Sequence, residues 1–145
     1  MSCLLKFILK IGIFACFVDY SMAGATEDQM MSAGKLMRDV CLPKFSKVSP
    51  EVADNIGKGI MPDEKDVKCY INCILEMMQT IKKGKFLYES SLKQVDILMP
   101  DHYKEEYFNG LAQCKDAANG IKNNCDSAYA LLKCLHAAIP RFMFP

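Results

Sequence analysis

Two cysteines four residues apart, Cys69 and Cys73, constrain this chain more than any other feature. They lie in the segment 66–80, where most positions are apolar and polar residues recur at steps of three or four, as in a helix packed on several sides. On a helix their Cβ atoms are about 5–6 Å apart, whereas a disulfide requires about 3.5–4.5 Å. Each cysteine must therefore bond elsewhere, and the sequence predicts a central helix that is cross-linked twice.

Residues 1–25 have the pattern of a secretory signal peptide. Lys6 and Lys10 begin it, an apolar run follows, and small residues allow cleavage after Ala23 or Ala25. The apolar run is too short to span a membrane, which takes about 20 residues. The sequence thus predicts one secreted domain over 26–145 that is not embedded in a membrane.

The predicted domain carries 16 basic and 16 acidic residues, so its net charge is zero. A nucleic-acid partner would favour a basic excess, and none is expected. Six cysteines remain after cleavage, and an even number in a small secreted chain predicts disulfides. No metal or cofactor is expected, because the close pair Cys69 and Cys73 has no second close pair to complete a zinc site.

Apolar periodicity and end signals predict an all-α domain of about six helices and no strand. The expected ranges are 27–45, 49–57, 66–80, 90–99, 101–120 and 124–139. Polar residues are expected to start or cap five of them: Ser49, Asp63 or Asp66, Ser90 or Ser91, Asp101, and Asn124 or Asp126. Gly34 would weaken the first helix at mid-length, and Pro43 would kink or break it just after Cys41.

A basic run, Lys82, Lys83 and Lys85 around Gly84, follows the central helix. It is either an anion-binding patch or a solvated helix end. Lysines complement the negative end of a helix dipole, and glycine suits the left-handed position after a helix. The sequence favours the helix end.

Catalytic motifs are missing from the sequence. It has only two histidines, His102 and His136, and no H-E-x-x-H, G-x-S-x-G or phosphate-binding glycine loop. We therefore predict that the protein is not an enzyme. Eight methionines, five phenylalanines and five tyrosines in the domain either fill its core or line an adaptable cavity, which disulfide cross-links would allow.

The cysteine spacing, with 27, 3, 40, 10 and 8 intervening residues, resembles that of the insect six-cysteine odorant-binding proteins, the pheromone/general odorant-binding family. The segments 41–45, 68–70 and 83–86 agree with it. The ending 142–145 resembles Lush-like, alcohol-binding members, but Phe144 stands where those carry Trp. The resemblance implies six helices around an apolar cavity and the bonds Cys41–Cys73, Cys69–Cys125 and Cys114–Cys134.

The resemblance implies a secreted, non-enzymatic carrier of small hydrophobic odorants or pheromones, including alcohols. It would deliver them through sensillum lymph to olfactory receptors, as a monomer or homodimer. The alternative is a secreted helical scavenger, toxin or effector in haemolymph, saliva or seminal fluid.

Side chains expected to face inward would line the cavity: Met37, Met77, Thr80, Leu98, Leu111, Leu131, Leu135, Phe142 and Phe144. The resemblance places Thr80, one turn beyond Met77, against an alcohol hydroxyl. In the alternative interpretation, the Thr80 hydroxyl bonds to the Glu76 carbonyl.

The tail 141–145 is too apolar to prefer water, yet its prolines prevent a helix. In the family such tails form part of the cavity wall, so we predict a lid rather than a frayed end. Arg38 or the Tyr70 hydroxyl would hold the terminal carboxylate. His136 would loosen the lid in mild acid, because histidines titrate near pH ~6.5.

Overall fold

The computed structural model describes residues 25–145, so the predicted signal peptide up to residue 24 lies outside the described residues. The described part confirms an all-α domain with six α-helices. They are α2 (Glu27–Cys41), α3 (Pro50–Gly57), α4 (Lys65–Met77), α5 (Tyr88–Leu98), α6 (Asp101–Gln113) and α7 (Asn124–Ala138). A 3-10 helix, η2 (Leu42–Lys44), extends α2, and two short strands, β1 (Ile81–Lys82) and β2 (Lys85–Phe86), follow α4.

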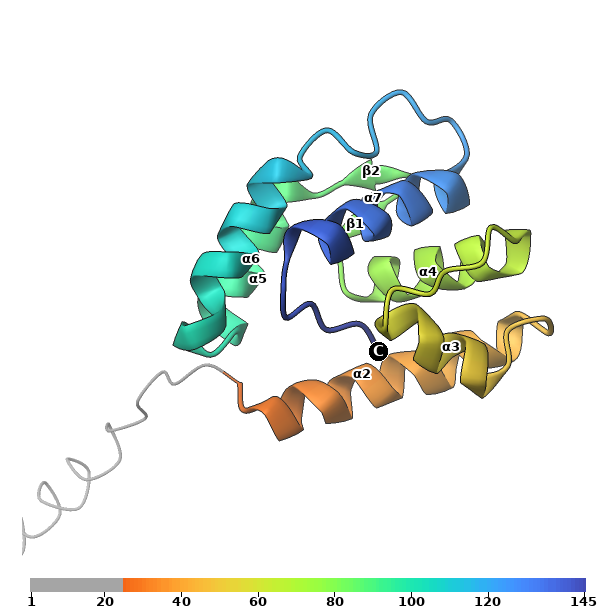
Figure 1. Ribbon diagram of the computed structural model, residues 1–145, viewed down its shortest axis with the longest axis horizontal. Helices are drawn as coiled ribbons and strands as arrows, with labels where there is room; N and C mark the ends of the chain where they lie inside the picture. Colours follow the sequence, from red (N-terminus) through yellow and green to blue (C-terminus); the bar gives the residue numbers. More distant parts are fainter. Residues whose placement is uncertain (1–24) are drawn as a thin grey trace, which may run out of the picture.

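Helices α4 and α7 pack side by side at the centre of the domain (Figure 1). Helix α2 contacts α4, while α5 and α6 form a pair whose α6 member contacts α7. The apolar positions of α4 are buried as predicted: Val67, Tyr70, Ile71, Ile74 and Leu75. Their neighbours on α7 include Leu131, Leu132 and Leu135, all buried in the same core.

Three disulfides connect the helices as the resemblance implied. Cys73 of α4 bonds Cys41 at the end of α2, and Cys69 of α4 bonds Cys125 of α7. The third bond joins Cys114, just after α6, to Cys134 of α7. Each such bond typically stabilises a domain by about 2–4 kcal/mol. The prediction that the central helix is cross-linked twice, and not within itself, is confirmed.

Helix starts match the sequence expectation where a side chain can reach the free backbone amides. The Ser49 hydroxyl accepts a hydrogen bond from the Val52 amide, with Pro50 as the first helical residue. Asn124 is the first residue of α7, and Asn123 caps it by accepting from the amides of Cys125 and Asp126.

Other expected caps are wrong. Glu64 precedes α4 and makes no side-chain cap, so neither Asp63 nor Asp66 has that role. Helix α5 starts at Tyr88, earlier than Ser90 or Ser91, and the Ser91 hydroxyl donates to the Leu87 carbonyl inside the first turn. Helix α6 has Pro100 at its N-cap position instead of Asp101, which becomes the first helical residue.

Helix α2 stops at Cys41 and tightens into η2, which contains Pro43, so the break predicted at Pro43 is confirmed. Two other helices end earlier than predicted. Helix α4 stops at Met77, because Gln79 takes a left-handed φ of 54°. Helix α6 stops at Gln113, and turns replace the expected helix up to Gly120. Apolar periodicity continues through each of these segments, and it alone does not locate the end of a helix.

The basic run is a β-hairpin, which corrects two predictions: the absence of strands and the helix end at 82–85. Ile81 pairs with Phe86, and Lys82 with Lys85, in an antiparallel ladder. The two residues between them, Lys83 and Gly84, have φ of 48° and 73°. Two positive φ angles in a two-residue loop define a type I′ turn, whose twist matches that of the strands. Each strand has only two residues, which is too short for an alternation of apolar and polar side chains, so the sequence carries no strand signal here.

Gly84 offers a test of how the hairpin is held. It packs against the first turn of α7, where a Cβ added to Gly84 would lie 2.8 Å from Asn124 Oδ1 and 3.3 Å from Ser127 Oγ. Gly120 has a similar φ of 78° but nothing within 4 Å. We expect Gly120→Ala to lower the free energy of unfolding by about 1 kcal/mol, through backbone strain alone. Gly84→Ala should lose about 1 kcal/mol more, because Asn124 and Ser127 must shift.

Urea unfolding of the two variants measures this difference. Equal losses would mean that the contact between the hairpin and α7 contributes nothing to stability.

Candidate functional site: the core and the C-terminal tail

The C-terminal tail lies against the helical core, between α7 and α2 (Figure 1). Phe142, Met143 and Phe144 are half-buried and pack on the buried cluster. The last residue, Pro145, sits on Gly34 of α2, where an added Cβ would lie 3.2 Å from the proline ring. Gly34, expected only to weaken the helix, therefore gives the tail room to approach α2.

Tyr107 of α6 fixes the middle of the tail. Its side chain is buried, its ring lies 6.2 Å from that of Phe142, and its hydroxyl accepts a hydrogen bond from the Met143 amide at 2.9 Å. The hydroxyl also donates a long hydrogen bond to the Arg141 carbonyl, 3.5 Å away. Burial raises the pKa of Tyr107 to about 12. This phenol therefore stays neutral in acid and at neutral pH, and its contribution to stability is lost only as the pH rises above about 10 towards 12.

Arg141 fixes the start of the tail to α6. Its guanidinium group lies 3.0 Å from the Glu106 carboxylate, donates to the His102 carbonyl at 2.6 Å, and stacks 4.4 Å from the centre of the Tyr103 ring. The Tyr103 hydroxyl donates to Glu27 at the start of α2. Sequence reasoning missed the contact of Tyr107 with the tail and the contact of Arg141 with α6. Two signals could have indicated them: Tyr107 lies on the inward face of its helix, and Arg141 is the only charged side chain of the tail.

Within residues 25–145, no hydrogen bond or ion pair joins the terminal carboxylate to Arg38 or Tyr70, the residues predicted to hold it. Arg38 pairs with Asp54 and donates to the Pro50 carbonyl, which joins α2 to α3. Tyr70 is fully buried in α4, and its hydroxyl has no hydrogen-bond partner within residues 25–145. Burial also raises the pKa of Tyr70 above its ordinary value.

His136 lies against the tail. Its ring centre is 6.1 Å from that of Phe142 in an edge arrangement. Its other neighbour is Gly59, where an added Cβ would collide with the imidazole. The ring is thus held between the tail and the connector that follows α3.

The nine residues predicted to line a cavity fall into four groups. Leu111, Leu131 and Leu135 are buried in the core, and Met37, Phe142 and Phe144 pack on it half-buried. Thr80 is 7% exposed and lies beyond α4, not on it. Met77 and Leu98 are 39% and 51% exposed, so they lie at the surface.

Backbone hydrogen bonds hold Thr80 in the bend before β1. Its amide donates to the Leu75 carbonyl, and its carbonyl accepts from the Leu87 amide. The Glu76 carbonyl, the alternative partner of its hydroxyl, accepts from the Gln79 amide instead. The expected helical position of Thr80 is therefore wrong, although the residue is buried as expected.

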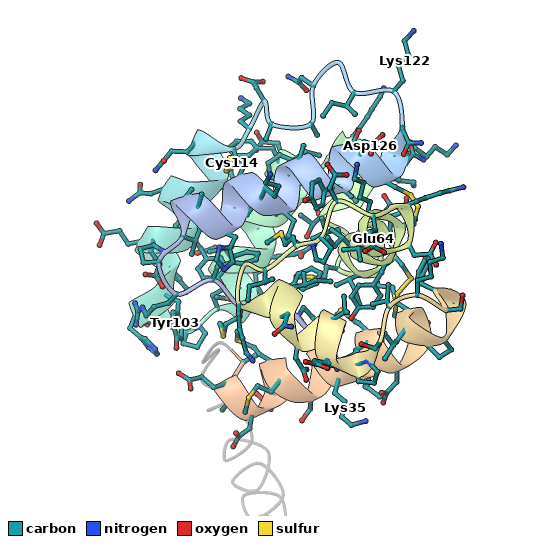
Figure 2. All side chains as sticks on the ribbon, turned by 45° about the vertical axis from the view of Figure 1, so that its right-hand side comes forward. Lys35, Glu64, Tyr103, Cys114, Lys122 and Asp126 are labelled. Carbon is teal, nitrogen blue, oxygen red and sulfur yellow. A yellow bond between two sulfur atoms is a disulfide. The ribbon has the colours of Figure 1, made fainter. Side chains whose placement is uncertain are left out.

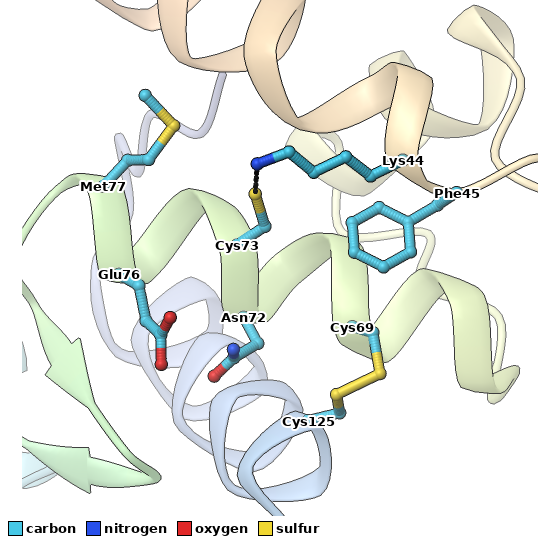
Figure 3. Close-up of a pocket in the computed structure, with 8 residues that line it drawn as sticks. All are labelled: Lys44, Phe45, Cys69, Asn72, Cys73, Glu76, Met77 and Cys125. Carbon is cyan, nitrogen blue, oxygen red and sulfur yellow. Dashed lines mark hydrogen bonds between the residues drawn. A yellow bond between two sulfur atoms is a disulfide. The ribbon is translucent and has the colours of Figure 1, made fainter.

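A groove of about 530 Å³ runs along α4 on the surface (Figure 3). It is lined by Lys44, Phe45, Cys69, Asn72, Cys73, Glu76, Met77 and Cys125. Of the nine predicted residues only Met77 takes part. The charged Lys44 and Glu76 are exposed in it, so this groove is wetter than the apolar cavity that the sequence predicts.

Within residues 25–145, no group of three or more His, Cys, Asp or Glu side chains is placed to hold a metal ion. No helix in that range is long and apolar enough to cross a membrane.

Trypsin can report how often the tail opens, because it cleaves after Arg141. We expect Tyr107→Phe to speed release of the segment 142–145 about three- to tenfold. The Met143 amide loses its acceptor, a hydrogen bond worth about 0.5–1.5 kcal/mol, and cleavage follows the open population. Mass spectrometry measures the rate. Tyr103→Phe is the matched control, since it keeps the ring under Arg141 and loses only the bond to Glu27. Equal rates in the two variants would exclude Tyr107 as the residue that holds the tail.

Comparisons with known proteins agree with this architecture. The model of the PBP/GOBP family matches residues 23–138. General odorant-binding protein 19a of Drosophila melanogaster is 64% identical over 130 residues, covering 88% of this chain and 89% of the relative. General odorant-binding protein 72 of Anopheles gambiae is 46% identical over 120 residues, covering 83% and 98%.

Two solved structures share the fold. Odorant binding protein 4 of Chrysopa pallens superposes with a TM-score of 0.75 at 40% identity, covering 83% of this chain and 98% of that one. Odorant binding protein 5 of Apis mellifera gives a TM-score of 0.75 at 28% identity, covering 84% and 98%. The chain therefore belongs to the PBP/GOBP family of insect odorant-binding proteins, which makes it a binding protein and not an enzyme.

Proposed function

We propose that this protein is a secreted carrier that holds a small hydrophobic molecule between its helical core and its C-terminal tail. The observation that carries the proposal is the tail itself. Three consecutive apolar side chains, Phe142, Met143 and Phe144, lie half-buried on the core without regular secondary structure. No disulfide includes any residue of the tail, so it can move while the helices stay in place.

The energies favour such a site. An apolar ligand gains about 25 cal/mol for each Å² that it removes from water, so about 200 Å² is worth about 5 kcal/mol. The hydrogen bonds of Tyr107 that fix the middle of the tail are worth about 0.5–1.5 kcal/mol each. A ligand can therefore move the tail outward, and the tail then closes over the ligand instead of directly over the core.

A hydroxyl could select the polar end of the ligand. Within residues 25–145, three small polar residues are buried: Thr80, Ser91 and Ser127. The hydroxyls of Ser91 and Ser127 each donate to a backbone carbonyl. No hydrogen bond of the Thr80 hydroxyl occurs within residues 25–145, and we assign it to the hydroxyl of an alcohol ligand. Delivery through sensillum lymph to an olfactory receptor completes the proposal.

We also propose His136 as the acid-sensitive contact of the tail. Its ring packs on Phe142 and Gly59, so a charge placed there loses hydration unless the ring turns outward. Turning outward would remove one of the supports of Phe142 and loosen the tail.

Displacement of a fluorescent apolar probe tests the proposed function. Medium-chain alcohols and the alkanes of equal length should both displace the probe from the wild-type protein, with the alcohols stronger. Thr80→Ala should reduce that preference by about two- to tenfold, because only the alcohol loses a hydrogen bond. Thr80→Val, which keeps the shape, should behave like Thr80→Ala. Equal weakening of alcohols and alkanes would make Thr80 a packing residue, and a protein that binds no apolar probe would not be a carrier.

Repeating the displacement at about pH 7 and about pH 5 tests the role of His136. The wild-type protein should bind more weakly in acid, and His136→Gln should lose most of that difference. A full pH effect in His136→Gln would place the acid-sensitive group elsewhere.

A further inference from the structure

Three lysines at the tip of the β1–β2 hairpin have no role in the fold described so far. Lys82, Lys83 and Lys85 are all exposed. At the end of a helix they would complement its dipole, but α4 ends at Met77, so this explanation does not apply. Gly84, between them, lies against the first turn of α7, the positive end of that helix. The lysines therefore add positive charge where the backbone is already positive.

Two further features of the lysines destabilise the hairpin locally. The register sets Lys82 directly opposite Lys85, and like charges at that position destabilise a strand pair. Lys83 adopts a φ of 48°, a left-handed conformation that asparagine and glycine tolerate better. Three lysines are thus held at a place where neutral residues would be more stable.

A fourth lysine extends the patch. Lys122 is exposed in the loop just before α7, and Figure 2 shows it projecting away from the core. The ion pairs within residues 25–145 engage Lys35, Lys68 and Lys104, and none of these four lysines. Asp126, the acid in the first turn of α7, is bound to Lys68. We call Lys82, Lys83, Lys85 and Lys122 the lysine surface.

We propose that the lysine surface is a docking site for an acidic, Asp- and Glu-rich segment of an extracellular protein. Because the domain has no net charge, attraction of an acidic segment would come from these four lysines, which form no ion pair within residues 25–145, and not from an overall positive charge. Such a field orients the protein and speeds its encounter with an acidic partner. The proposal extends the carrier function and does not depend on which ligand is carried.

The chemistry of the lysine surface favours a carboxylate-bearing partner over a phosphate or a lipid. The patch contains lysines, which act as separate point charges, and no arginine, whose fork suits phosphate. The large exposed apolar residues of the described chain lie in α2, α4, α5 and the connector after α3: Met31, Leu36, Val40, Ile60, Met77, Ile97 and Leu98. None lies in the hairpin or beside Lys122, so this end has no apolar group to insert into a bilayer.

The test uses the full domain with its three disulfides and a short poly-glutamate peptide, compared with a poly-glutamine peptide of equal length. Amide resonances of the hairpin and of residues around Lys122 should shift on titration with poly-glutamate only. Affinity should fall as salt rises, since the contact is between exposed charges. A triple variant, Lys82→Gln, Lys83→Asn and Lys85→Gln, should bind about tenfold more weakly and fold at least as well, because asparagine suits the type I′ turn.

A matched control distinguishes the effect of the lysine surface from the effect of net charge. A second triple variant, Lys47→Gln, Lys58→Gln and Lys93→Gln, removes the same charge from exposed sites outside the lysine surface. It should keep affinity within about twofold of the wild-type protein. Equal losses in the two variants would overturn the proposal. So would tighter binding to vesicles containing phosphatidylserine, or to inorganic phosphate, than to poly-glutamate. Probe displacement by alcohols should be the same in all three proteins, so failure here is distinguishable from failure of the carrier function.

Discussion

The rest of the structure depends on the double cross-link of α4. Cys69 and Cys73 face the same side of one helix, yet they bond to α7 and to the end of α2. The first and the last helix of the domain, α2 and α7, are thereby both bonded to α4. Lys68, one residue before Cys69, adds ionic contacts to Asp63 and Asp126, and these raise the pKa of Lys68. The disulfides join helices and leave the tail out, which is why the proposed function assigns movement to the tail.

The tail is held by a different kind of contact. Two α6 side chains, Tyr107 and Glu106, bind it through hydrogen bonds and one ion pair, and Gly34 lets Pro145 approach α2. Burial keeps the Tyr107 phenol neutral in acid and at neutral pH, since the pKa of Tyr107 is about 12. Phe142 lies between two rings, those of Tyr107 and His136.

Much of the fold could be predicted because it follows from periodicity and covalent geometry. The apolar face of α4 and the separation of Cys69 from Cys73 predicted a doubly cross-linked central helix, and only the resemblance to the odorant-binding family supplied the partners. Helix ends failed where backbone conformation decides, as at Gln79 with its left-handed φ. The hairpin at 81–86 was missed because two-residue strands carry no alternation. The contact of Tyr107 with the tail and the contacts of Arg141 with α6 were missed because they form only through tertiary packing.

Hydrogen exchange, resolved by residue, measures whether the tail moves independently of the cross-linked helices. Amides in the middle of α4 and α7 should exchange only through global unfolding, whereas the Met143 amide should exchange through a smaller, local opening. Adding an apolar ligand should speed exchange at Met143, because the ligand displaces the tail from Tyr107, and it should not speed exchange in the middle of α4 and α7. The contrary result is a single opening free energy for Met143 and for the α4 core, unchanged by ligand. It would mean that the tail opens only when the whole domain unfolds, and the tail could not admit a ligand.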